Sequence, residues 1–328
     1  MNMQNLKDRI KNRIKITIEA FRSDFHFSVK LAFFRMLDDL LTRIHIKSLS
    51  SFFHNKKDKW ILKYLSSMLK NIILEYQGEA FGGVYIKDAP IWVCWWSGID
   101  DAPALVKQCV KSIQKNSANH TVYFISKDTY KQYITIPDFI FQRFNEGNMC
   151  AAHFSDYLRY SLLEKYGGLW LDATIFVSQE LPEEYFSSPF FTCKSNITET
   201  RFISKYRWTT FCIGGWKDNI LFNFLKLSLE NYWKQNDVAI DYLFLDYLIE
   251  IAYNTIPSIR NQIDKVPLNN LSRDDLQAAM NAALRSDDID KVLNNETILY
   301  KLSWREKYSM TTQCGEKSIY AGFLNLQL

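Results

Sequence analysis

The sequence predicts an α/β protein, in which an open sheet with helices on its faces follows a separate helical region. Residues 91–96 (IWVCWW) and 121–126 (TVYFIS) are apolar runs of the length of short buried strands. An amphipathic run, residues 102–116, separates them, and this strand–helix–strand alternation is typical of a Rossmann-like half-sheet. Before residue 78, apolar residues recur instead every three or four positions, as they do in helices.

This N-terminal helical region is basic. Residues 1–77 hold 15 Lys/Arg against 7 Asp/Glu, although the 328-residue chain has a net charge of only +4. We expect its helices to break at residues 54–59 (HNKKDK) and to resume at Trp60. They could pack on the main domain or lie on a bilayer surface, and the basic flanks leave both open. The apolar positions with helical spacing are Ile10, Ile14, Ile18, Phe21, Phe25, Val29, Phe33, Leu37, Leu40 and Ile44.

A glycine-bearing stretch, residues 78–90 (GEAFGGVYIKDAP), indicates a domain boundary. We therefore expect a basic helical N-terminal region over residues 1–80 and the α/β domain over 81–328. The length and the 47% apolar content allow a large domain with such an appendage.

Further elements follow from the pattern in chain order. Residues 151–167 form a strong helix ended by Gly167, and residues 168–178 form the next strand. We also expect a helix to begin near residue 127, three later helices over 219–236, 240–254 and 273–286, and a late strand over 297–305.

Composition excludes several classes. The six cysteines are scattered without a CxxC pair, which argues against a structural zinc site and a disulfide framework. The N-terminus lacks the apolar core of a signal peptide, and no run of about 18 apolar residues exists, so we expect a cytoplasmic protein. Aromatic residues reach 15%, which suits a large core and also surfaces that bind sugars, bases or lipid headgroups.

One carboxylate, Asp172, interrupts the most apolar run of the chain. Ligands of open α/β sheets gather beyond the carboxyl ends of the strands, so Asp172 is well placed to meet one. Asp156 and Arg159, three residues apart, share a face of the preceding helix. Arg159 can hold a phosphate and Asp156 can accept hydroxyl hydrogen bonds. The alternative is a structural ion pair beside a turn that Asp172 caps, and spacing alone leaves both open.

Residues 155–174 (SDYLRYSLLEKYGGLWLDAT) resemble the signature of the capsular polysaccharide synthesis glycosyltransferases. These are bacterial relatives of glycosyltransferase family 32, whose members share a DxD sugar-transferase motif. The likeness spans roughly residues 88–308, and its other segments are 91–113, 136–156, 232–248 and 299–304.

The resemblance implies a GT-A type fold, a UDP-sugar donor, and transfer with retention at the anomeric carbon. It implies that Asp156 and Arg159 hold the sugar and the phosphates of the donor, and that Asp172 matches the first DxD carboxylate. The residues that it places around the rest of the donor are Trp95, Trp96, Ser97 and Gly98 after the first strand, and Ser303 and Trp304 at the late strand.

The third DxD position is Thr174 instead of a carboxylate. The resemblance implies Mn²⁺ or Mg²⁺ on the leaving diphosphate, and hard oxygen ligands suit either ion. We expect Asp172 and Thr174 to hold this ion weakly. Alternatively, Arg159 and Lys301 supply part of the charge stabilisation.

A retaining transfer also gains from carboxylates near the sugar. Asp241 and Asp246 are five residues apart and so do not share a helical face, and we expect one of them, Asp241, to serve the site. Its alternative role is that of a helix N-cap.

Three functions fit these observations. The first is a retaining hexosyltransferase acting on a lipid-linked oligosaccharide, with residues 1–77 in peripheral contact with the inner face of the cell membrane. The second is a protein-modifying glycosyltransferase of the toxin or effector kind, although such enzymes usually keep a full DxD. The third is a non-catalytic nucleotide-sugar-binding protein. We expect no nucleic-acid partner.

Overall fold

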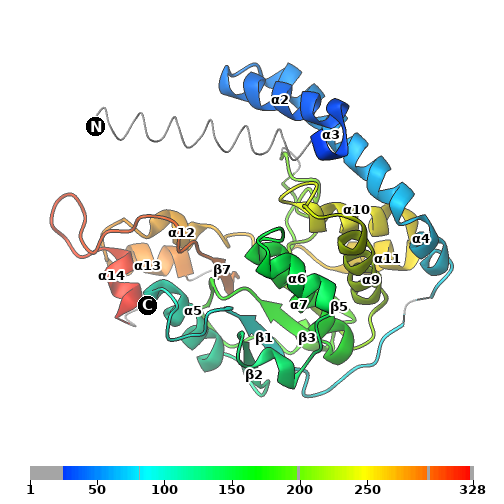
Figure 1. Ribbon diagram of the computed structural model, residues 1–328. Coiled ribbons are helices and arrows are strands. Elements are labelled where there is room, and N and C mark those ends of the chain that lie inside the picture. The colour runs from blue at the N-terminus through cyan, green and yellow to red at the C-terminus, as the bar shows by residue number, and fades with distance from the viewer. Residues whose placement is uncertain (1–24, 81, 198–199, 294–295, 326–328) are drawn as a thin grey trace.

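The structure, a computed structural model, describes residues 25–80, 82–197, 200–293 and 296–325. A five-stranded sheet forms its centre (Figure 1). β1 pairs in parallel with β2 and β3, whereas β6 is antiparallel to both β3 and β5, so four strands point the same way. In spatial order the strands are β2 (Val122–Ile125), β1 (Ile91–Cys94), β3 (Gly168–Leu171), β6 (Cys212–Gly215) and β5 (Phe190–Thr192). The predicted α/β fold with a Rossmann-like first half is confirmed.

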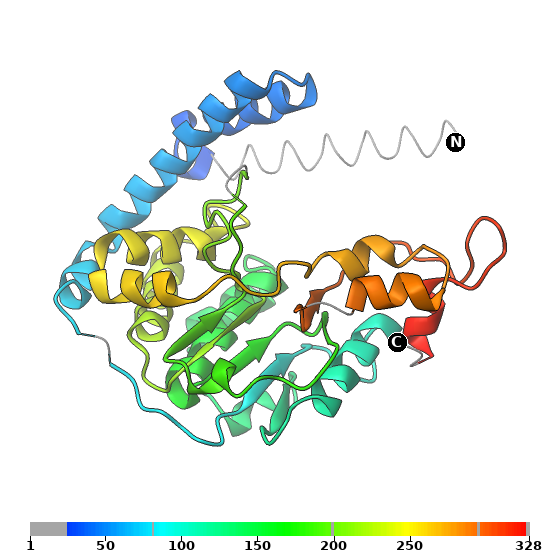
Figure 2. The same ribbon diagram turned by 180° about the vertical axis from the view of Figure 1, so that it is seen from behind.

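Side chains alternate between the two faces of this sheet, as the strand pleat requires. Trp92 and Trp170 lie in one hydrophobic cluster, and Ile91 and Val93 lie in another. Helices cover both faces (Figures 1 and 2). The first cluster is covered by α6 (Asp138–Asn145), α7 (Ala151–Tyr166), α9 (Ile220–Gln235), α10 (Phe244–Thr255) and α11 (Pro257–Lys265), and the second by α5 (Ala104–Lys115) and α8 (Glu184–Ser187).

The run 168–178 is two strands, not the single one predicted. β3 ends at Leu171, and β4 (Ile175–Val177) pairs antiparallel with β7 (Leu299–Lys301) in a second, two-stranded sheet. The chain turns between them, where the Ile175 amide donates to the Asp172 carbonyl at 2.9 Å. Asp172 therefore lies where the two sheets meet. Three short helices pack beside the small sheet: α12 (Asp275–Ala279), α13 (Ser286–Leu293) and α14 (Ile319–Leu324).

Helices also form the N-terminal region: α2 (Val29–Arg43), α3 (Lys47–Met68) and α4 (Lys70–Tyr76). The predicted break at residues 54–59 is wrong, because α3 runs through it. Two of its polar side chains, Lys57 and Asp58, are buried against the main domain, where Asp58 accepts a 2.6 Å hydrogen bond from Tyr247, so the polar stretch does not end the helix. Ile61 and Leu65 of α3 are fully buried in the first cluster. Predicted helical positions 10–21 lie outside the described residues.

Two further helix predictions were too long. The segment after β2 forms only a 3₁₀ turn, Tyr130–Gln132. Just before it the Ser126 amide donates to Thr129 Oγ1 at 2.9 Å, and such local side-chain bonds compete with a helix. The helix predicted over 273–286 is α12 alone. It ends at Ala279, after which the Ala282 carbonyl accepts from the Ile319 amide at the start of α14, and the Leu284 amide donates to the Lys317 carbonyl just before that helix.

Candidate active site

A cavity of about 630 Å³ opens at the carboxyl ends of β1 and β3. Its walls come from the loop after β1, from α7, from the turn after Asp172, from the end of β7 and from the start of α10. Ten residues expected at the site line it: Trp95, Trp96, Ser97, Asp156, Arg159, Asp172, Thr174, Lys301, Ser303 and Trp304.

Arg159 joins the two carboxylates of the signature stretch. One guanidinium nitrogen, Nη1, lies 2.5 Å from Asp156 Oδ1, and the other, Nη2, lies 3.3 Å from Asp172 Oδ1. The Arg159 side chain is only 5% exposed, and its guanidinium lies 4.8 Å from the centre of the Trp170 ring. Packing and ion pairs therefore hold this arginine in one position at the cavity wall.

Two glycines create this juxtaposition. Gly167 ends α7 with φ of 67°, and Gly168 begins β3 with φ of 93°, a region that favours glycine. A Cβ at Gly168 would lie 2.1 Å from the Pro90 carbonyl oxygen, so no side chain fits there. The chain thus reverses within two residues, and β3 carries Asp172 back to Arg159.

Lys301 contacts Asp172 from the small sheet. Its Nζ lies 2.8 Å from Asp172 Oδ2 and 2.9 Å from Thr174 Oγ1. The antiparallel pairing of β4 and β7 produces this contact, because Lys301 is the register partner of Ile175, the residue after Thr174.

Asp172 and Thr174 were the expected ligands of Mn²⁺ or Mg²⁺, and the Lys301 ammonium occupies the position between them. Arg159 holds the other oxygen of Asp172. Within the described parts of the chain, no group of three His, Cys, Asp or Glu side chains could hold a metal ion. As arranged, this donor set does not fit a divalent cation, since both oxygens of its one carboxylate already contact cations.

The two carboxylates have opposite pKa shifts. Burial alone would raise the pKa of Asp172, but Lys301 and Arg159 outweigh burial and lower it. For Asp156, burial outweighs Arg159 and His153, and its pKa is raised. The pair therefore combines a firmly ionised group with one that accepts a proton more readily.

Aromatic rings form the outer wall. Trp95 and Trp304 meet edge to face at 5.7 Å, and Trp304 is 45% exposed. Trp96 instead packs inward, with its ring 4.8 Å from Phe154. Gly98 does not line the cavity. Its amide donates to the Trp95 carbonyl at 2.9 Å and closes the turn, with φ of 96°.

Asp241 lies outside the cavity, contrary to its expected role. Its carboxylate accepts from the Leu243 amide at 2.9 Å and lies 3.1 Å from Arg35 and 3.7 Å from Lys57. Asp241 thus connects the N-terminal helices to the start of α10. Its contact with the Leu243 amide is similar to a helix N-cap, its alternative role.

Asp246 lines the cavity in its place. Trp208 Nε1 donates to its Oδ1 at 2.8 Å, and burial raises the pKa of Asp246 to about 7. Helix α10 begins only at Phe244, which turns position 246 and not 241 toward the cavity. Tyr242 and Thr210 also line it, and no sequence signal pointed to either.

The model of a family described as capsular polysaccharide synthesis protein matches residues 42–322. The chain belongs to this family. The assignment confirms the resemblance drawn from the signature stretch, and it supports the expected class of enzyme, a glycosyltransferase. The match includes every cavity residue named above and most of the N-terminal helices.

The chain is also similar to solved structures, among them one described as PaToxG glycosyltransferase. The likeness has a TM-score of 0.39 and 15% identity, and it covers 73% of this chain and 94% of the other. No curated protein matches the sequence.

Proposed function

We propose that this chain is a retaining glycosyltransferase that moves a hexose from a UDP-sugar to a lipid-linked oligosaccharide during capsule synthesis. One observation carries the proposal: Arg159 and Lys301 converge on Asp172 at the wall of a single cavity. Family membership supports the biological setting.

The donor diphosphate would bind to the two cations. Arg159 offers a planar fork that suits phosphate oxygens, and Lys301 offers a compact ammonium group. The Lys301 side chain is 27% exposed, so its ammonium can reach a ligand in the cavity while it still contacts Asp172. The exposed ring of Trp304 and the neighbouring Trp95 would stack on the base.

Lys301 would also stabilise the leaving group. When the bond to the sugar breaks, negative charge grows on the diphosphate, and a fixed cation beside it lowers the barrier. An ammonium between Asp172 and Thr174 supplies that charge at the place where the wider DxD pattern puts a metal. The role of Mn²⁺ or Mg²⁺ stays a prediction that metal removal tests.

Two carboxylates would face the transferred sugar. Asp156 and Asp246 both line the cavity, and both have raised pKa values. A carboxylate near the anomeric carbon stabilises an oxocarbenium-like transition state, whereas a protonated carboxyl donates a hydrogen bond to a sugar hydroxyl.

Membrane contact would involve α2. Val29, Phe33, Met36, Leu40 and Ile44 recur at helical spacing and are 41–66% exposed. Figures 1 and 2 show α2 against α3, away from the central sheet. Lys30, Lys47 and Lys56 are exposed on the same two helices, and basic residues beside an apolar stripe are typical of helices lying on anionic lipid. Among the described residues, none of the helices combines the length and hydrophobicity needed to cross a bilayer.

Transfer of radiolabelled sugar tests the proposal. The protein is incubated with labelled UDP-sugars and membranes from the producing cell, and label is counted in the butanol-extractable lipid. We expect transfer by the wild type and none by Asp172→Asn. Label on protein would favour a protein-modifying enzyme, and binding of UDP-sugar without turnover would favour a non-catalytic binding protein.

A further inference from the structure

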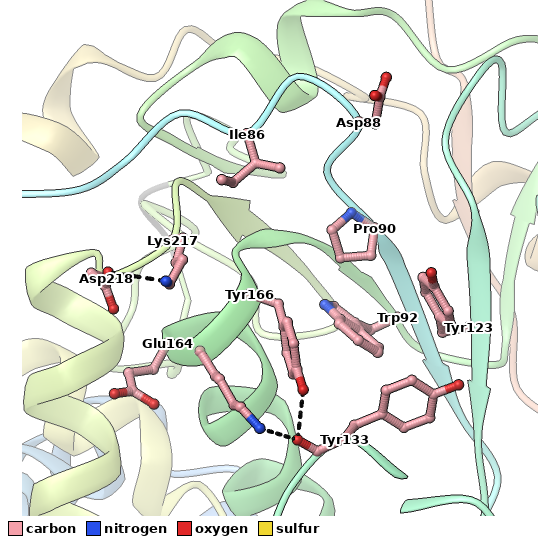
Figure 3. A pocket seen from close by; sticks show the side chains of 11 residues that line it. Ile86, Asp88, Pro90, Trp92, Tyr123, Tyr133, Glu164, Tyr166, Lys217 and Asp218 are labelled. Atoms are coloured by element: carbon pink, nitrogen blue, oxygen red, sulfur yellow. Dashed lines mark hydrogen bonds and ion pairs between the residues drawn. The ribbon is translucent and has the colours of Figure 1, made fainter.

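A second cavity, of about 570 Å³, lies where β1 and β2 begin, at the opposite edge of the sheet from Asp172 (Figure 3). We call it the amino-end cavity. Pockets for small ligands span about 300–1,000 Å³, so the space suits a ligand of a few rings. The four residues of β3 separate the two edges by roughly 13 Å, and no residue lines both cavities.

Four aromatic rings form one wall of the amino-end cavity. Trp92 is 1% exposed, and its Nε1 donates to the Gly167 carbonyl at 3.0 Å. The rings of Tyr123, Tyr133 and Tyr166 surround it at 5.1, 5.4 and 5.4 Å. Figure 3 shows these rings gathered on one side, and each tyrosine is partly exposed.

Hydrogen bonds hold this wall in place. The Tyr133 carbonyl accepts from Tyr166 Oη at 2.8 Å and from Lys165 Nζ at 2.6 Å, which ties the loop after β2 to the end of α7. The backbone of Lys217 also lies close to the end of α7, since a Cβ at Gly167 would lie 2.5 Å from the Lys217 amide nitrogen. The cavity is therefore formed before any ligand binds.

Three polar groups at the cavity make no hydrogen bond or ion pair to the described residues. Asp88 is exposed, and no ion pair or hydrogen bond engages its carboxylate within the described ranges. The phenol groups of Tyr123 and Tyr133 likewise make no hydrogen bond to the described residues. Three carboxylates and two lysines line the cavity, a balance that disfavours phosphate groups and nucleotides.

We infer that the amino-end cavity binds a saccharide chain, separately from the donor site. A pyranose ring presents C–H groups to an aromatic face and hydroxyls to carboxylates and phenols, and this wall offers both kinds of group. These rings are part of the high aromatic content of the chain, and they lie outside the donor cavity. It rests on the proposed function, because a capsule-synthesis enzyme meets oligosaccharides as acceptor and product.

Binding of defined fragments tests the inference. Oligosaccharides of two to six sugars are prepared from the surface polysaccharide of the producing cell and titrated calorimetrically against the full chain. We expect the hexasaccharide to bind, and Tyr133→Ala to weaken binding roughly tenfold, as the loss of a stacked ring should. Asp88→Asn, at an exposed position, should weaken it severalfold. Phe202→Ala, which removes an exposed ring elsewhere, should not change it.

Donor turnover separates this inference from the proposed function. Nucleotide release from UDP-sugar in water should be unchanged in Asp88→Asn, while Asp172→Asn should lose it and still bind the hexasaccharide. Turnover that depends on Asp172 without hexasaccharide binding would overturn the inference alone. Hexasaccharide binding that is sensitive to Tyr133, without turnover, would overturn the proposed function alone. Binding that UDP abolishes would place the saccharide in the donor cavity and also overturn the inference.

Discussion

Lys301 and Asp172 form a 2.8 Å ion pair across 129 positions of the chain. The contact exists because β7 returns beside β4 in the small sheet, next to the turn that carries Asp172. The same ammonium contacts Thr174 Oγ1, so one lysine bridges the first and third positions of the DxD-like motif.

The first prediction concerns this lysine. Because Lys301 supplies fixed charge beside the diphosphate, sugar transfer should persist after EDTA treatment. Lys301→Ala should lose roughly 10²–10³-fold in kcat, the usual cost of one electrostatic contact to a transition state. Lys307→Ala, at an exposed lysine nearby, is the matched control. Loss of wild-type activity in EDTA, with recovery on adding Mn²⁺, would instead show that the reaction needs a metal ion and would refute this role of Lys301.

Asp172 carries the second prediction. Asp172→Asn should abolish measurable transfer, because it releases Lys301 and Arg159 from their shared carboxylate. The amide is preferable to alanine, since its oxygen can still accept from Trp170 Nε1, which donates to Asp172 at 3.0 Å. Circular dichroism and Tm should report a folded protein. Glu180→Gln, at an exposed carboxylate beyond β4, should keep full activity, and near-normal transfer by Asp172→Asn would remove this residue from the site.

Asp246 gives a third prediction, on stability against pH. Its folded pKa of about 7 lies above the ordinary aspartate value of 3.8, so the unfolded chain ionises first as pH rises. The stability that this group contributes is full below pH 4 and is lost as pH rises toward 7, by about 1.4 kcal/mol per pH unit for one proton. Asp246→Asn should flatten this part of the curve and raise Tm at pH 8. Parallel wild-type and variant curves from pH 4 to 8 would contradict the assignment.

The fourth prediction is a reactive thiol. Cys150 Sγ lies 3.3 Å from His153 Nδ1 at the start of α7. Burial alone would raise the pKa of Cys150, but its hydrogen bond with His153 outweighs burial and lowers it. Iodoacetamide at pH 7 should therefore modify Cys150 faster than Cys314, the other exposed cysteine in the part of the chain that the structure describes.

Because Ala151 and Ala152 line the donor cavity, UDP should slow that modification. Peptide mass spectrometry follows both cysteines in one sample. Equal rates at the two thiols would show that His153 does not activate Cys150, and Cys150→Ser serves as the blank.

The fifth prediction concerns the apolar face of α2. Deleting residues 1–77 is a poor test, because Ile61 and Leu65 belong to the main core. The triple variant Val29→Ser, Phe33→Ser and Leu40→Ser changes only exposed positions and should lose flotation with anionic phosphatidylglycerol vesicles. The double variant Leu268→Ser and Leu271→Ser, also at exposed positions, should float like the wild type. Unchanged flotation of the triple variant would leave α2 without a membrane role.

Local sequence alone determined much of this site. Helix α7, its end at Gly167 and the strand after it were readable from spacing, because a helical face and a glycine turn are set by near neighbours. That spacing correctly brought Asp156 and Arg159 to one face, and the signature stretch correctly indicated the family.

Tertiary packing decided the rest. The division of 168–178 into two strands depends on β7, more than a hundred residues later, and so does the ion pair of Lys301 with Asp172. Helix α3 continues through its polar stretch because that stretch packs on α10, where Tyr247 donates a hydrogen bond to Asp58. Whether Asp241 or Asp246 lines the cavity depends on where α10 begins relative to the N-terminal helices. Sequence periodicity indicates which residues are neighbours along one helix or strand. Contacts between residues far apart in the chain form only when whole elements pack together, and the sequence pattern does not predict them.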